Sequence, residues 1–114
     1  MLSIEALRRY GANVDEALAR CFQNEAFYLR LVGMIVQDTN LEKLKEALAA
    51  GDTDKAFEAA HALKGVLANL ALTPVLTPVS EITELLRART QTDYAPLLAD
   101  IEARYAELME IVRS

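Results

Sequence analysis

The residues from Thr53 to Leu70, TDKAFEAAHALKGVLANL, contain the pattern from which the fold can be predicted. Small and apolar residues recur in this stretch at steps of three and four, the spacing of one helical face: Ala56, Ala60, Leu63, Leu67 and Leu70. Asp52 or Thr53 can cap the start of the helix, and we expect the helix to run to about Leu72. The pattern therefore predicts a long amphipathic helix with one buried stripe.

His61 is the only histidine in the chain, and it lies off this stripe. At about 100° per residue, His61 is roughly 140° from the centre of the stripe, so we expect its side chain to face solvent. The residues one helical turn away are Phe57 and Glu58 before it, and Lys64 and Gly65 after it. The sequence thus predicts an exposed imidazole between charged, aromatic and small neighbours.

Gly65 is unexpected inside this helix, because a glycine there costs about 1 kcal/mol relative to alanine. It lies on the predicted exposed side, where close helix packing does not require it. The missing Cβ clears space beside His61, and Lys64 brings an ammonium group towards the same space. A neutral imidazole, with an ordinary pKa of about 6.5, can attack phosphorus near pH 7. Because phosphoryl transfer needs mainly positioning and charge stabilisation, this arrangement suits a phosphoryl acceptor. Glu58 would either orient the ring or repel the phosphoryl group.

Three shorter helices are predicted before residue 38. Ser3 caps the first, which Gly11 stops. Asn13 begins the second, which we expect to run to about Phe22, and Asn24 caps the third. Larger side chains from these helices and from the C-terminal one are predicted to lie in the core or at its edge: Phe22, Phe27, Met34, Tyr105 and Met109.

Three longer helices accompany the central one. The first follows a junction at residues 38–40 and ends at Gly51–Asp52. The second begins at Thr73–Pro74 or at Thr77–Pro78, because both pairs resemble a cap followed by a proline in the first turn. A proline deeper in a helix costs about 3 kcal/mol, so the earlier start would kink this helix. The last helix starts near Asp93 after a polar turn.

Short polar turns between amphipathic helices indicate an up-down bundle. We therefore predict an all-α fold, an antiparallel up-down four-helix bundle with short additional N-terminal helices. A chain of 114 residues suits one hydrophobic core, and no linker or repeat interrupts it. Residues 1–114 are expected to form a single domain.

The composition restricts the partners and the location of the protein. The net charge of −5 argues against nucleic acid and against an anionic membrane surface as partners. No apolar run is long enough to span a bilayer, and the N-terminus lacks a signal-peptide core. Cys21 is the only cysteine, which excludes an internal disulfide, and we interpret it as a small buried apolar residue. We expect a cytoplasmic protein.

The sequence also resembles a known family. The stretch His61-Ala-Leu63-Lys64-Gly65, followed by Leu70-Ala71-Leu72 and Leu76, is similar to the motif of histidine-containing phosphotransfer (HPt) domains. That motif is H-x-L-K-G, then a glycine or alanine, then a leucine in the next helix. The wider stretch from about residue 24 to residue 86 resembles the family too. Ala71 departs from the glycine of many members, and Pro78 is unusual in the following helix.

The resemblance implies a four-helix bundle that accepts a phosphoryl group from a receiver-domain aspartate and passes it on, with no kinase activity of its own. His61 would be the phosphoryl acceptor, Lys64 would stabilise charge, and Gly65 would leave space for the phosphoryl group and the partner. The implied partners are response-regulator receiver domains and, in addition, a histidine kinase. No intrinsic cofactor is expected, and magnesium is expected only on the receiver partner.

Three alternatives remain open at the level of sequence. Glu58-x-x-His61 has the spacing found in di-iron helical bundles, although one histidine would require a dimer to complete the site. A helical adaptor without phosphotransfer is the second alternative. The third is a piece of a chemotaxis-type kinase, whereas the chain length favours a free-standing protein.

Overall fold

The stretch around His61 forms α5 (Thr53–Asn69) in the computed structural model, which describes residues 1–114. Asp52 caps this helix, and its carboxylate accepts a hydrogen bond from the backbone N–H of Lys55 at 3.1 Å. The predicted stripe is confirmed, since all five of its residues are at most 5% exposed.

The C-terminal end of α5 differs from the prediction by three residues. The backbone N–H of Ala71 donates to the carbonyl of Ala68 at 3.1 Å, and that of Leu72 donates to Leu67 at 3.0 Å. These bonds form a Schellman motif, in which Ala71 takes the left-handed conformation with a φ of 56°. This conformation disfavours any residue with a Cβ. It therefore explains why glycine suits this position of the motif better than alanine.

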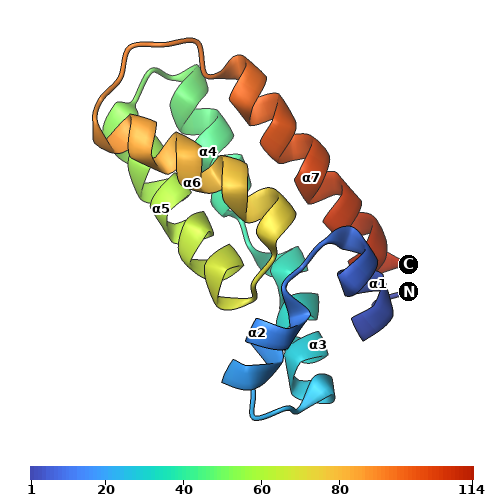
Figure 1. The fold of residues 1–114 in the computed structure, drawn as a ribbon. Helices are drawn as coiled ribbons and strands as arrows, with labels where there is room; N and C mark the ends of the chain where they lie inside the picture. Colours follow the sequence, from blue (N-terminus) through green and yellow to red (C-terminus); the bar gives the residue numbers. More distant parts are fainter.

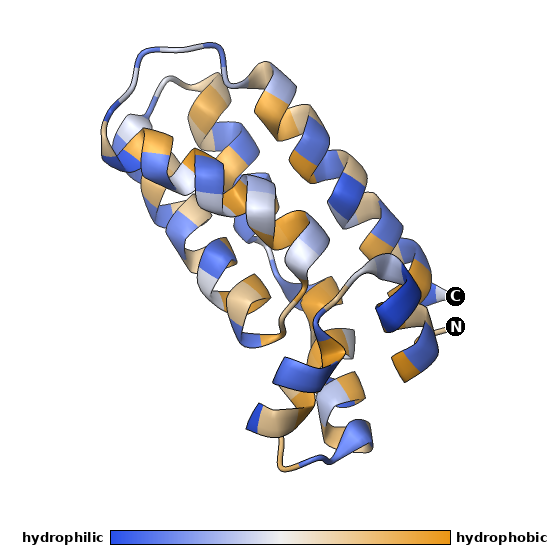
Figure 2. Cartoon of the chain, in the orientation of Figure 1, coloured by the Kyte–Doolittle hydropathy of each residue, from blue (hydrophilic) through white to orange (hydrophobic).

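The predicted four-helix bundle is confirmed. It comprises α4 (Asn40–Ala49), α5, α6 (Thr73–Arg87) and α7 (Ala95–Arg113), which run alternately up and down (Figure 1). α4 packs on α5, α5 on α6, and α6 on α7. Bands of hydrophobic and hydrophilic residues follow one another along each helix (Figure 2), as expected for helices with one buried and one exposed face. The helices close on one core whose fully buried side chains include Leu44, Leu63, Leu67, Val75, Ile82, Ile101 and Leu108.

The earlier of the two predicted starts of α6 is right. The helix begins at Thr73, with Leu72 rather than Thr73 as the N-cap residue and Pro74 in the first turn. Pro78 lies inside the helix and is buried, so one internal N–H donor is missing there. The carbonyl that lacks this donor is that of Pro74, four residues earlier, and the hydroxyl of Thr77 donates to the neighbouring carbonyl of Thr73 at 3.1 Å.

The N-terminal part consists of α1 (Ile4–Tyr10), α2 (Val14–Arg20), α3 (Glu25–Gly33) and a short 3-10 helix, η1 (Met34–Gln37). α1 packs against α7, while α2 and α3 extend beyond one end of the bundle (Figure 1). The two predicted N-caps, Ser3 and Asn24, are confirmed, and Asn13, which was predicted to begin the second helix, caps it. Each side chain accepts from a backbone N–H three residues later.

Hydrogen bonds from Arg20 and Tyr28 fix these helices to the end of α5. The guanidinium of Arg20 donates to the carbonyl of Ala68 at 2.8 Å, and the hydroxyl of Tyr28 donates to that of Leu70 at 2.9 Å. The carbonyl of Ala68 also accepts from Ala71, whereas that of Leu70 has no backbone donor, so the Tyr28 hydroxyl supplies its hydrogen bond. The end of α5 that follows His61 is therefore held by α2 and α3.

Three of the predicted core positions are wrong. Phe22, Phe27 and Met34 are 92%, 41% and 55% exposed. Phe22 lies in the turn after α2, with a φ of 55°. The buried face of α3 is formed by Tyr28 and Val32, one turn apart, which leaves Phe27 and Met34 outside it.

The other predicted positions are confirmed. Tyr105 and Met109 are partly buried at the edge of the core, and Cys21 is 8% exposed. Cys21 therefore packs as a small apolar residue.

We expect Tyr28→Phe to destabilise the fold by about 1–2 kcal/mol, because it leaves the buried carbonyl of Leu70 without its donor. Burial raises the pKa of Tyr28 to about 12, and the unfolded chain has a tyrosine pKa of about 10. The neutral hydroxyl thus contributes stability below pH 10, which is lost as the pH rises from about 10 to about 12.

Urea unfolding of the Tyr28→Phe variant and the parent at pH 8 and pH 11 measures both effects, and the variant should lose less stability at the higher pH. Tyr94→Phe is the matched control, because the Tyr94 hydroxyl donates to the exposed carbonyl of Thr90. Equal effects of the two substitutions would contradict the role given to Tyr28.

Candidate functional site

His61 lies exposed on α5, on the side of the helix away from the buried stripe, as predicted. Its ring stacks on that of Phe57 one turn earlier, with ring centroids 5.5 Å apart and an interplanar angle of 20°. Phe57 itself is partly buried against the core. The imidazole is therefore supported from one side by an anchored aromatic ring while its other side faces solvent.

The space beside His61 is open, as the glycine predicted. A Cβ built on Gly65 would meet no heavy atom within 4 Å outside its own turn. No packing constraint in the fold explains a glycine here, and alanine would favour the helix by about 1 kcal/mol. Gly65 thus leaves the surface one turn after His61 free of side-chain atoms.

The side chain of Lys64 extends from α5 towards the neighbouring helix α6. This side chain is 35% exposed, and its Nζ lies 3.7 Å from Oε2 of Glu84 on α6. Nε of Arg87 lies 3.2 Å and 3.4 Å from the two carboxylate oxygens of the same glutamate. Two cations from neighbouring helices therefore share one carboxylate.

Arg87 also connects this charged group to the aromatic support of His61. Its guanidinium carbon lies 4.9 Å from the centroid of the Phe57 ring, a cation–π contact. A continuous set of contacts thus runs from Lys64 through Glu84 and Arg87 to Phe57 and His61.

Glu84 and Arg87 were not predicted as site residues. Their spacing of three places them on one face of α6, which the sequence shows. The sequence does not show which residues of α5 this face meets, because that depends on how the two helices pack. The charge pattern alone could therefore have suggested an ion pair within α6, and it could not have suggested the link to Lys64.

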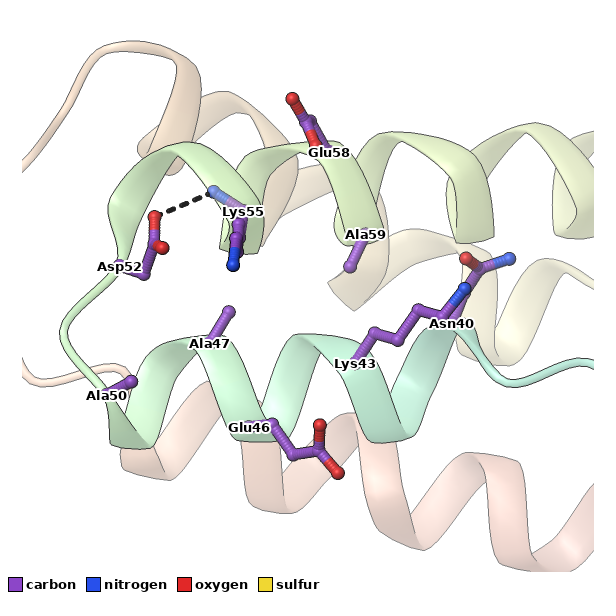
Figure 3. A pocket seen from close by; sticks show the side chains of 9 residues that line it. All are labelled: Asn40, Lys43, Glu46, Ala47, Ala50, Asp52, Lys55, Glu58 and Ala59. Carbon is purple, nitrogen blue, oxygen red and sulfur yellow. Dashed lines mark hydrogen bonds between the residues drawn. The ribbon is translucent and has the colours of Figure 1, made fainter.

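A groove of about 480 Å³ lies between α4 and α5, and its lining includes Glu58, one turn before His61. Figure 3 shows Lys43 and Lys55 in it, with Glu58 at its edge and projecting away from α4. Its walls carry both signs of charge, since Glu46 and Asp52 also line it. Glu58 is exposed one turn before His61, and the structure places no hydrogen bond between them.

The outward position of His61 disagrees with the di-iron alternative, in which ligands project into the bundle interior. No group of three or more histidine, cysteine, aspartate or glutamate side chains in the structure is arranged to hold a metal ion. Both proposed ligands, Glu58 and His61, lie on the solvent side of α5.

A family model described as "Hpt domain" matches residues 36–111, two thirds of the chain. The chain belongs to the HPt domain family. Searches of curated proteins and of solved structures give no match. HPt domains are helical bundles that act in phosphorelays, together with receiver domains and kinases.

The match lies further towards the C-terminus than the resemblance noted above, which ran from about residue 24 to residue 86. It includes α4, α5, α6 and α7 as far as Ile111, and it leaves α1, α2 and α3 outside the HPt region. The HPt region therefore contains the complete set of contacts around His61.

None of the helices is both long and apolar enough to cross a membrane.

Proposed function

We propose that this HPt domain accepts a phosphoryl group on His61 from the aspartate of a receiver domain and passes it on. The observation that carries the proposal is the exposed imidazole of His61 beside the open surface at Gly65. A phosphoryl group held on a partner's carboxylate can be reached only by a nucleophile that projects from its own surface. Gly65 gives the partner room to approach.

The transfer is a single displacement at phosphorus. The lone pair of the unprotonated ring nitrogen attacks, and an N–P bond forms while the P–O bond to the aspartate breaks. The electron pair leaves with the carboxylate, and the proton on the other ring nitrogen stays in place. Lys64 stabilises the charge on the phosphoryl oxygens, and the open surface at Gly65 accommodates them.

The same proposal defines what the protein does not do by itself. It is a phosphotransfer intermediate without kinase activity, so a histidine kinase is a further partner upstream. It uses no intrinsic cofactor, and the magnesium ion belongs to the receiver domain. It acts in the cytoplasm, where response-regulator receiver domains are found.

Incubation with a receiver domain carrying a radiolabelled aspartyl phosphate tests the proposal. We expect label on this chain that survives alkali and is lost in acid, the behaviour of a phosphoramidate. Absence of label would contradict the proposal, and so would label that survives acid, because a phosphorylated hydroxyl would then be the acceptor.

The alternative, a helical adaptor that binds without phosphotransfer, is favoured by one observation. Phe22, Phe27, Met34 and Val36 leave large apolar side chains exposed at the N-terminal end of the molecule. An adaptor would bind a receiver domain and acquire no label. The labelling experiment therefore separates the two functions.

Gly65→Leu should slow transfer from the receiver domain by at least about tenfold while leaving the fold intact. The leucine side chain fills the open surface beside His61, whereas its Cβ meets no atom of this chain. A glycine-to-leucine change should also stabilise the helix, by about 0.8 kcal/mol.

Rates of label transfer and thermal midpoints measure the two effects. Ala103→Leu is the matched control, because it adds similar bulk to an exposed position on α7. Unaltered transfer in the Gly65→Leu variant would show that the partner does not use this space.

A further inference from the structure

The ion pair between Lys64 and Glu84 raises a question about the charge near His61. A phosphoryl group carries about −1.5 to −2 charges at neutral pH, and Lys64 is its nearest cation on α5. In the structure, however, the Lys64 ammonium lies 3.7 Å from the Glu84 carboxylate on α6. The same ammonium group cannot fully serve both anions.

The pair is weak enough to exchange partners. Glu84 is 57% exposed and Lys64 is 35% exposed, and ion pairs at such positions contribute little to stability. A phosphoryl group carries more charge than a carboxylate, and it offers three acceptor oxygens. Lys64 therefore gains by leaving Glu84 when His61 becomes phosphorylated.

Glu84 is not left alone when Lys64 moves. Both of its oxygens lie within 3.4 Å of Nε of Arg87, three residues later on the same helix. Arg87 is held in turn over the Phe57 ring, against which His61 stacks. The carboxylate thus has a second, fixed cation, which lowers the cost of losing Lys64.

We propose that Glu84 is a positioning residue of the His61 site. Its carboxylate holds the Lys64 ammonium while His61 is unphosphorylated, and the phosphoryl group on His61 then displaces it. This exchange lowers the fraction of phosphoryl groups found on His61 at equilibrium. The attraction between Lys64 and the phosphoryl group is partly offset by the loss of the ion pair between Lys64 and Glu84. This inference rests on the proposed function.

The test measures the equilibrium partition of label between the receiver domain and this chain. Glu84→Gln should shift the partition towards His61 by about two- to fivefold, the range of an exposed ion pair. Glu81→Gln is the matched control, since it removes the same charge from an exposed position of α6 and should leave the partition within the error of the parent. Both variants should unfold cooperatively, and Glu84→Gln should lower the thermal midpoint only slightly, because the ion pair that it removes is exposed.

A double-mutant cycle identifies Lys64 as the mediator. Lys64→Ala should shift the partition away from His61, and adding Glu84→Gln to Lys64→Ala should then have no more effect than Glu81→Gln. Raising the salt concentration should reduce the effect of Glu84→Gln, because exposed charges are screened.

Each other result overturns the inference. A Glu84→Gln partition equal to that of Glu81→Gln, or shifted towards the receiver, would show that Glu84 does not compete for Lys64. A shift that persists in the Lys64→Ala background would show direct repulsion of the phosphoryl group by the carboxylate. If the parent chain takes up no label at all, it is the proposed function that fails.

Discussion

The His61→Gln variant should take up no detectable label from a phosphorylated receiver domain, and its fold should be unchanged. A glutamine amide has no nucleophilic nitrogen lone pair, so the N–P bond cannot form. The side chain is exposed, and its only aromatic contact is the stacking on Phe57, so the substitution removes little buried surface. Transfer assays and circular dichroism measure the two parts of this expectation.

Glu58→Gln provides the control for His61→Gln. It alters an exposed side chain one helical turn before His61 and leaves the imidazole in place. We expect this variant to remain labelled. Label on the His61→Gln variant at the level of the parent would place the acceptor elsewhere and would remove the basis of the proposed function.

Leu63→Asp should unfold the domain. Leu63 is fully buried on α5, in the stripe that faces α4 and α6. The loss of the side chain costs about 2–5 kcal/mol, and an unpaired carboxylate in the core adds several more. Domains of this size are stable by about 5–15 kcal/mol in total, so little or no native state should remain.

Ala62→Asp is the neighbouring control, because Ala62 is exposed on the same helix. It introduces the same charge one residue away and should leave the domain folded. Circular dichroism and urea unfolding distinguish the two variants. Cooperative unfolding of Leu63→Asp near the parent midpoint would show that this face of α5 is not the core of the bundle.

Together, these two substitutions test the orientation of one helix. His61 and Leu63 are two residues apart, and the structure places the first outside and the second inside. We expect the outer change to abolish transfer and preserve the fold, and the inner change to abolish the fold. The opposite pattern would require α5 to be rotated.

The sequence predicted those features that depend on neighbouring residues. The buried stripe of α5 follows from apolar residues at steps of three and four, and the exposure of His61 follows from its angle to that stripe. Ser3 and Asn24 were predicted as caps from their residue type and position, and Asp52 as one of two candidates; in the structure each accepts from a backbone N–H three residues later. Such interactions occur within one or two helical turns, so they can be derived from the order of residues.

The sequence limited the start of α6 to two positions and did not decide between them. Thr73–Pro74 and Thr77–Pro78 both fit the start of a helix, and the structure selects the first while keeping Pro78 inside. Burial of Val75 and Val79 on the core face accompanies this choice. Val75 precedes Pro78, so its burial in the helix requires the earlier start, and that burial depends on the other helices.

Only the tertiary structure decided which residues of different helices meet. Phe22, Phe27 and Met34 resemble core residues by composition, but α2 and α3 bury other faces. The contact of Lys64 with Glu84, and of Arg87 with Phe57, depends on the packing of α6 against α5. Helical periodicity fixes the face on which a residue lies and leaves open the rotation and the axial shift of the neighbouring helix, so the sequence determined the exposed imidazole, while the fold determined the charges around it.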